Sequence, residues 1–290
     1  ICEFEPPGEM LWEDRVFLRF YGIDTLAEVY LNGDLLFTSD NMFITYEYEV
    51  KNLLRKGRNV LRVKISSPLA YAEEKFRERP LYGVEGTIPG YQHIRKAHYM
   101  YGWDWGMQLP DMGIWRDVEL VGKSLCEITG ASYKQEFKDG YKKLSLTVTP
   151  ELRPFVIRPA QLLTEIELSD GRSLVSRKPV HQCETLSFEI ENPPLWYIRG
   201  YGKQPLQKVR FTLLEDGREV DRYEERIGFR ELTVLNDEKN GKFCFVCNGL
   251  EVFAMGADVI PQDQILPNIT ERRTEYMLRQ CVRANFNCIR

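Results

Sequence analysis

The chain has 290 residues, of which 43% are hydrophobic and 28% are charged, and its formal net charge at pH 7 is −4. These proportions predict a globular protein of two domains or one large domain, and they exclude wholesale disorder. Because acidic and basic side chains nearly balance, we expect no sequence-independent binding to nucleic acid or to an anionic membrane. Residues 243–261 form the most apolar run, but Glu251 and Asp258 interrupt it, so no transmembrane helix is predicted.

The ends of the chain and its cysteines bear on where the protein resides. Ile1 stands where an initiator Met would be and no signal peptide is recognisable, so we expect a piece cut at both ends from a longer protein. Seven thinly spread cysteines favour a reducing compartment, which predicts a cytoplasmic protein. Cys244 and Cys247 have a redox or zinc spacing, but they lie in an apolar strand pattern without a second pair. We interpret them as buried structural thiols and expect no metal ion and no cofactor.

Short β-strands are predicted throughout the first 68 residues. Apolar and polar side chains alternate in them, as in strands with one buried face. Asn32 and Gly33 separate two of the strands and supply the positive φ angles of a type I′ hairpin turn. Strands at such regular spacing predict a sandwich or barrel. The predicted strands are residues 16–20, 27–31, 35–37, 46–50 and 61–65.

A single surface helix over residues 68–79 interrupts this pattern, and residues 81–113 follow without any regular period. Gly, Pro and aromatic residues are abundant in that stretch. So long a loop in a compact domain is typically functional or disordered, and its aromatic content argues against disorder. Residues 114–121 are then predicted to form a closing strand.

A second β region is predicted over residues 124–232. About a hundred residues with this strand spacing predict an immunoglobulin-like sandwich, although the Cys-Trp-Cys signature of antibody domains is absent. The alternating segments are residues 144–148, 163–168 and 209–213, and Asp-Gly turns occur at 170–171 and 216–217.

The C-terminal segment has a different pattern. A hairpin over residues 243–255 precedes an amphipathic helix over residues 270–284, which begins with a Thr cap. Residues 287–290 then begin another strand. A helix that leads into a strand predicts the beginning of a β/α unit rather than a finished domain.

Trp103 and Trp105 flank the carboxylate of Asp104, with Gly102 and Gly106 on either side. Carbohydrate sites are built from such parts, because aromatic rings cover the apolar faces of a sugar and a carboxylate accepts hydrogen bonds from its hydroxyls. The alternative is structural: both tryptophans belong to the core of a sandwich edge, and Asp104 caps a turn. The residues alone support the two interpretations equally.

The stretch from His93 to Gly106 resembles the Arg-Lys…Phe-Gly-Trp-Asp-Trp-Gly signature of the β-mannosidases of glycoside hydrolase family 2. Other segments resemble that family in the same order: 21–33, 41–43, 192–196, 202–206, 226–230, 245–249, 256–261 and 284–290. The resemblance implies a mainly β fold. It comprises a jelly-roll-like sugar-binding β-sandwich over residues 1–122, an immunoglobulin-like β-sandwich over 123–232, and the truncated beginning of a catalytic (β/α)8 barrel over 233–290.

Four residues depart from the family's pattern. Tyr101 stands where the family usually has Phe, and Met107 stands where it has Pro. Asp258 and Val259 replace a common Asn-Trp pair, and this change bears on the substrate contacts expected from the first barrel strand.

The resemblance implies an exo-acting enzyme that hydrolyses terminal β-linked mannosides with retention, using one carboxylic acid as acid/base and another as nucleophile. The acid/base of the family is a Glu directly after an Asn, and the chain contains no Asn-Glu dipeptide. We therefore expect an inactive N-terminal fragment that holds no catalytic residue, with both catalytic Glu beyond residue 290.

By the same resemblance, Trp103, Asp104 and Trp105 are substrate-binding residues, and Arg290 lies near the active site of the full-length enzyme. The expected partner is a β-mannoside oligosaccharide, and we also consider a homodimer of the intact enzyme. Three neighbours are expected to pack and orient the site rather than bind ligand: His93, Arg95 and His98.

Two other functions stay open at this point. The first is another glycosidase of the same family, of the β-galactosidase or exo-glucosaminidase type, against which the Trp-Asp-Trp-Gly stretch argues. The second is a non-catalytic carbohydrate-binding protein made of sandwiches, against which the helix at 270–284 argues, because sandwiches need no such unit.

Overall fold

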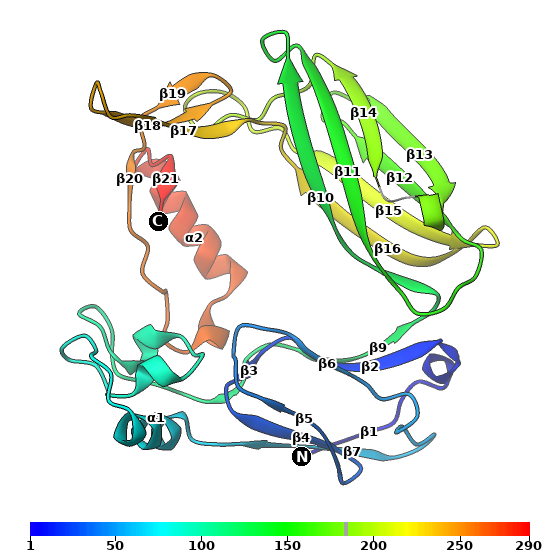
Figure 1. Ribbon diagram of the computed structural model, residues 1–290, viewed down its shortest axis with the longest axis vertical. Helices are drawn as coiled ribbons and strands as arrows, with labels where there is room; N and C mark the ends of the chain where they lie inside the picture. Colours follow the sequence, from blue (N-terminus) through cyan, green and yellow to red (C-terminus); the bar gives the residue numbers. More distant parts are fainter. Residues whose placement is uncertain (183–184) are drawn as a thin grey trace. The chain divides into compact units, whose positions relative to one another are not determined.

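A computed structural model describes residues 1–182 and 185–290, and β-strands predominate in it as predicted (Figure 1). None of the helices in this described part is both long and apolar enough to cross a bilayer. The chain divides into two compact units, Ile1–Gly122 with Ile260–Leu278 and Lys123–Val259 with Arg279–Arg290. Both units contain part of residues 233–290, so the assignment of that segment to a separate third domain stays a prediction.

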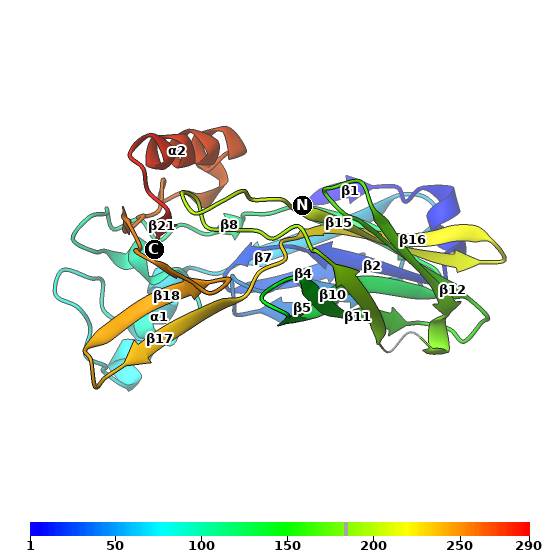
Figure 2. The ribbon, with the colours of Figure 1, turned by 90° about the horizontal axis from the view of Figure 1, so that it is seen from above.

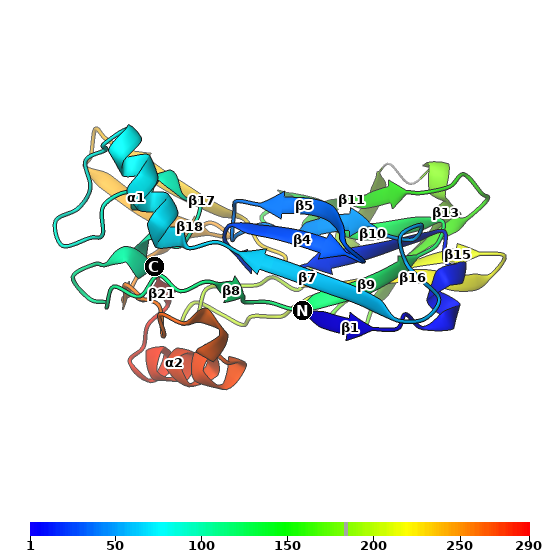
Figure 3. The same cartoon turned by 90° about the horizontal axis from the view of Figure 1, so that it is seen from below.

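Antiparallel sheets form the sandwich of the first unit. One sheet has the strand order β1-β7-β4-β5, and Figure 3 shows β5, β4 and β7 side by side. Another has the order β6-β2-β9, and β3 pairs with β8. The strands are β1 (Cys2–Phe4), β2 (Arg15–Phe20), β3 (Ile23–Asp24), β4 (Ala27–Leu31), β5 (Asp34–Ser39), β6 (Tyr46–Glu49), β7 (Asn59–Ile65), β8 (Gly113–Ile114) and β9 (Val118–Lys123).

The alternating pattern of these strands places apolar side chains in one core. Val16 and Phe20 on β2 are fully buried, as is Val29 on β4, and they belong to one cluster with Leu36 of β5. Asn32 and Gly33 join β4 to β5 with φ angles of 54° and 103°, which confirms the predicted turn with two positive φ angles.

The predicted strand over residues 114–121 is wrong as a single element. It is broken into β8 and β9, which belong to different sheets. The indole N–H of Trp115 donates a hydrogen bond to the carbonyl oxygen of Met42 at 3.2 Å, and its ring lies against Gly22 so closely that a Cβ there would collide. The backbone leaves the strand path at Trp115, where this side chain packs.

The predicted surface helix is α1 (Pro68–Glu78), and Ser67 caps it by accepting a hydrogen bond from the backbone N–H of Ala70. The residues between α1 and β8 form no strand and only two short 3-10 turns, η2 (Tyr91–His93) and η3 (His98–Tyr101). This irregular segment matches the long loop that the sequence predicts.

Seven strands form the immunoglobulin-like sandwich of the second unit. One sheet has the order β10-β11-β14 and the other β13-β12-β15-β16. Their inward side chains build a single core that includes Leu144, Leu146 and Phe211. The strands are β10 (Cys126–Lys138), β11 (Lys143–Pro154), β12 (Gln161–Glu167), β13 (Ser173–Pro179), β14 (Leu186–Glu191), β15 (Gln207–Glu215) and β16 (Arg218–Ile227).

A β-α-β unit ends the chain. The strands β20 (Gly256–Ala257) and β21 (Cys288–Ile289) pair in parallel, and α2 (Glu271–Arg283) lies between them in sequence. Parallel pairing across a helix is the element that a (β/α) barrel repeats, so the beginning of a barrel agrees with the structure. A small sheet precedes it, and Figure 2 shows β17 and β18 side by side. Its strands are β17 (Leu232–Asp237), β18 (Lys242–Cys247) and β19 (Leu250–Val252).

Cys244 and Cys247 both lie on β18. Because side chains alternate along a strand, residues three apart point to opposite faces, so the two thiols do not form a redox or zinc pair. Cys247 is buried, as predicted, whereas Cys244 is only half-buried.

The core of the second unit provides a first testable prediction. Leu146→Ala removes a side chain that is 1% exposed, and we expect it to lower the free energy of unfolding by about 2–5 kcal/mol. Val175→Ala on β13 is the control, because that side chain is 62% exposed and its loss removes little buried area. Chemical denaturation of both variants measures the difference, and equal losses would contradict the assigned core.

Candidate functional site

The three residues of the predicted binding motif lie on one tight turn. The backbone N–H of Gly106 donates to the carbonyl oxygen of Trp103 at 3.4 Å, and these two residues form an isolated antiparallel bridge. Asp104 and Trp105 therefore occupy the tip of the turn. The chain thus brings Trp103, Asp104 and Trp105 together by local hydrogen bonding, in a loop segment that also has an isolated bridge between Arg95 and Asn41.

Their side chains differ in exposure. Trp103 is 45% exposed and Asp104 is exposed, whereas Trp105 is half-buried against Tyr99, with the ring centroids 5.8 Å apart. No hydrogen bond joins the Asp104 carboxylate to any residue that the structure describes, so the alternative that it caps a turn has no hydrogen bond to support it. An exposed indole beside a carboxylate with unoccupied acceptor positions is suited to binding a hydroxylated ligand.

Glycines allow the turn to form where it does. Gly102 has φ 117° and ψ 147°, in a region that is essentially restricted to glycine, and a Cβ there would lie 2.8 Å from the carbonyl oxygen of Gly86. Gly106 packs against the amide of Gln264, which a Cβ would displace. The Oε1 atom of Gln264 is buried and has no hydrogen-bond partner among the described residues.

An ion-pair cluster joins the two ends of residues 96–111, the loop that carries the turn. The ammonium group of Lys96 is fully buried, donates to Asp24 on β3, and lies 3.3 Å from Asp111. Burial raises the pKa of the Asp24 carboxyl, although hydrogen bonds from Lys96 and Thr25 oppose that shift. Tyr101 lies in the same buried region, where burial raises the pKa of its hydroxyl.

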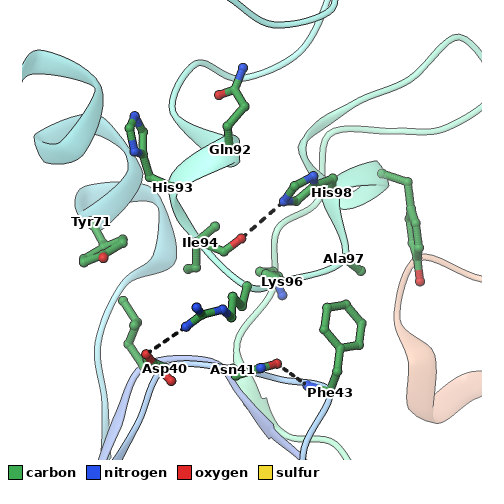
Figure 4. Close-up of a pocket in the computed structure, with 13 residues that line it drawn as sticks. Asp40, Asn41, Phe43, Tyr71, Gln92, His93, Ile94, Lys96, Ala97 and His98 are labelled. Carbon is green, nitrogen blue, oxygen red and sulfur yellow. Dashed lines mark hydrogen bonds and ion pairs between the residues drawn. The ribbon is translucent and has the colours of Figure 1, made fainter. Parts of the chain in front are cut away.

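A pocket of about 810 Å³ opens beside the same segment (Figure 4). Its lining includes Asp40 and Arg95, which form an exposed ion pair at 3.3 Å, and the exposed ring of Phe43. The Nε2 atoms of His93 and His98 lie 2.9 Å and 3.2 Å from backbone carbonyl oxygens. The two histidines and Arg95 thus have protein partners, and the packing and orienting role expected for them stays a prediction.

Arg290 belongs to the second unit. It ends the chain after β21, and its guanidinium group lies 3.1 Å from the carboxylate of Asp258, which follows β20. Asp258 is one of the residues that depart from the family pattern, and its charge pairs with the arginine implied to lie near the nucleophile. Both side chains are largely exposed in this chain. Among the described residues, no three His, Cys, Asp or Glu side chains gather closely enough to hold a metal ion.

The residues that pack or pair beneath the Trp103 turn could not be predicted from the sequence. Lys96 is the lysine of the Arg-Lys pair in the signature, but the resemblance gives it no role; Asp24 precedes Lys96 by 72 residues and Asp111 follows Lys96 by 15. Gln264 lies farther along the chain than any of them. The loop has no hydrophobic period from which a buried lysine could be predicted, so the sequence contains no local signal for this cluster.

Comparison with known proteins relates both units to carbohydrate enzymes. Residues 2–116 match the family model described as glycosyl hydrolase 2 galactose-binding domain-like, and residues 126–230 match that of glycosyl hydrolases family 2. Curated relatives include beta-mannosidase B from Aspergillus terreus, 32% identical over 277 residues, and from Thermothelomyces thermophilus, 32% identical over 289 residues. These matches cover 89% and 95% of this chain but 31% and 33% of the relatives. The chain therefore spans about a third of their length.

Solved structures agree with these matches. A β-D-mannosidase from Dictyoglomus thermophilum is 32% identical, with a TM-score of 0.88, and the match covers 99% of this chain and 36% of that protein. An exo-chitosanase from Amycolatopsis orientalis is 18% identical, with a TM-score of 0.71, and the match covers 99% of this chain and 31% of that protein. The second likeness concerns the fold alone.

The glycine that enters the turn provides a second prediction. We expect Gly102→Ala to lower the free energy of unfolding of the first unit by about 1–3 kcal/mol or more, because the backbone angles are unfavourable for alanine and its Cβ meets Gly86. Gly113→Ala at the end of the same segment is the control, since no atom lies within 4 Å of its Cβ. Chemical denaturation compares them, and equal stabilities would contradict the strained entry to the turn.

Proposed function

The chain belongs to glycoside hydrolase family 2, and from this premise we propose that it is the N-terminal part of a retaining, exo-acting β-mannosidase. One observation carries the proposal: the turn at Trp103 presents an exposed indole and the carboxylate of Asp104, to which no described residue is hydrogen-bonded. The turn belongs to the segment that resembles the β-mannosidase signature. The relatives at 32% identity, named as β-mannosidases, further support it.

The proposed role of this chain is to bind the substrate rather than to cleave it. Asp104 accepts hydrogen bonds from two hydroxyls of the terminal mannose, and Trp103 covers an apolar face of the ring. Arg290 lies near the nucleophile, where it pairs with Asp258 at 3.1 Å. Cleavage with retention needs a carboxylic acid and a carboxylate across the scissile bond. We propose that both belong to a part of the enzyme outside this chain, in keeping with the missing Asn-Glu dipeptide.

The remaining proposals concern the intact enzyme. Its substrate is a β-mannoside oligosaccharide, and its compartment is the cytoplasm. Solved structures of other carbohydrate enzymes share the fold at 15–22% identity, so their activities carry no weight for this chain. No observation favours a second function over the β-mannosidase.

A third prediction concerns the isolated chain. Purified residues 1–290 should release no chromophore from an aryl β-mannoside above the rate in buffer, because the chain contains no acid/base of the Asn-Glu type. The full-length enzyme at equal concentration is the control. Measurable turnover by the isolated chain would refute the proposed location of the catalytic carboxylates.

A fourth prediction tests Asp104 in the full-length enzyme. Charge-assisted hydrogen bonds contribute roughly 1.5–3 kcal/mol each, so Asp104→Ala should lower kcat/KM at least ~100-fold. Asp104→Asn keeps the size but offers one acceptor oxygen instead of two, and its kcat/KM should fall between. The melting temperature of both variants should stay near that of the parent, because the carboxylate makes no hydrogen bond within the described chain.

Asp34→Ala is the matched control, since Asp34 is an exposed aspartate at a turn in the same unit. Its kcat/KM should equal that of the parent. If the Asp104 variants kept kcat/KM within a few-fold and lost stability instead, Asp104 would be a turn residue and the proposed sugar contact would be wrong.

A further inference from the structure

The segment that carries the binding turn is closed at its base by one buried cation. Lys96 stands at the beginning of this segment and Asp111 at its end, and their side chains meet at 3.3 Å. Nearer to the turn, the backbone N–H of Leu109 donates to the carbonyl oxygen of Met100 at 2.7 Å and joins the two sides of the segment a second time. Residues 96–111 therefore form a loop that is pinched at its base, with the Trp103 turn inside it.

The same cation attaches this base to the sandwich. Lys96 also donates to Asp24, whose strand β3 pairs with β8 so that Asp24 lies opposite Gly113. Gly113 follows Asp111 by two residues. The two ends of the loop and the strand β3 thus converge on one ammonium group. No other ion pair among the described residues of the first unit joins both ends of this loop.

A buried ion pair of this kind contributes little to stability. The Lys96 side chain is 0% exposed and that of Asp24 is 4% exposed, so both charges lose their hydration. The attraction between such charges roughly offsets the loss of hydration, and apolar replacements are often equally stable. What such a pair can specify is geometry, because an ammonium group held between two carboxylates permits few arrangements of the chain segments that carry them.

We propose that Lys96 is a positioning residue, which acts through the Lys96–Asp111 and Lys96–Asp24 pairs to fix the Trp103–Asp104 turn in its substrate-binding geometry. This inference rests on the proposed function, because it assigns Lys96 a role only if Asp104 contacts the sugar. Displacement of a binding group by about 1 Å can reduce a rate 100-fold. Loss of the buried cation is therefore expected to reduce activity without contact between Lys96 and the substrate.

The test is a double-mutant cycle in the full-length enzyme, with an aryl β-mannoside as substrate. Lys96→Met keeps the length and apolar stem of the side chain, and kcat/KM should fall at least 10-fold. In an Asp104→Ala background the same substitution should lower kcat/KM by less than 3-fold, since the carboxylate is gone and only the Trp103 contact is left to position. Lys123→Met is the matched control, because Lys123, the last residue of β9 and the first of the second unit, is a part-buried lysine paired with Asp221 at 2.7 Å. Its effect on kcat/KM should stay within 2-fold.

Each other outcome overturns a distinct statement. If Lys96→Met keeps kcat/KM within 2-fold of the parent, or lowers it equally with and without Asp104, the positioning role is wrong and the proposed function stands. If Asp104→Ala itself keeps normal kinetics, the proposed sugar contact fails first.

A second variant covers the case in which Lys96→Met does not fold. Asp111→Asn leaves the Lys96–Asp24 pair intact and loosens only the base of the loop, where the Asp111 side chain is 35% exposed. We expect a loss in kcat/KM of about 3- to 10-fold that disappears when Asp104 is absent. An unchanged kcat/KM for this folded variant would overturn the proposal.

Discussion

The buried pair between Lys96 and Asp24 is the constraint on which the candidate site depends. The segment between α1 and β8 forms no strand, and isolated bridges at Arg95 and Trp103 are the strand-type pairing found there among the described residues. Small apolar clusters around Met42 and Tyr101 pack it, but such packing tolerates small shifts. The buried ammonium group of Lys96 restricts such shifts, because a shift that separates it from Asp24 leaves two buried charges unpaired. The loop is therefore held by electrostatics at its base and by close glycine contacts near its tip.

Most of the fold could be predicted from the sequence, because its strands have one buried face and hence a period of two. The type I′ turn at Asn32 and Gly33 and the capped helix α2 follow from local chemistry alone. The closing strand could not be predicted correctly, since Trp115 breaks it through a contact with Met42, 73 residues away in the chain. Local patterns determine which elements form, whereas distant contacts determine where they are interrupted.

The candidate site shows the same division. That Trp103, Asp104 and Trp105 come together is a consequence of adjacency and could be read from the sequence. That Asp104 has no hydrogen-bond partner in the described chain could not, because a turn-capping aspartate has the same sequence signature. The resemblance includes Lys96 in the signature, but its buried ion pairs could not be predicted, since the loop has no period and the two partners of Lys96 lie 72 and 15 residues away. The resemblance named Arg290 but not its pairing with Asp258, a residue that departs from the family pattern.

A binding carboxylate and its support have opposite requirements. Asp104 is exposed and unpaired, so its two oxygens can accept hydrogen bonds from a ligand without first breaking bonds to the protein. An exposed side chain on a loop is ordinarily mobile, however, and ordering it on binding would oppose affinity. The buried ion pairs of Lys96 order the loop from inside the protein. The Asp104 carboxylate can therefore stay exposed and unpaired while the loop that carries it is already ordered. Under the proposed function, this separation lets the chain deliver binding energy to a reaction whose acid and nucleophile it does not supply, because such energy accelerates cleavage only when the sugar is held in the correct place.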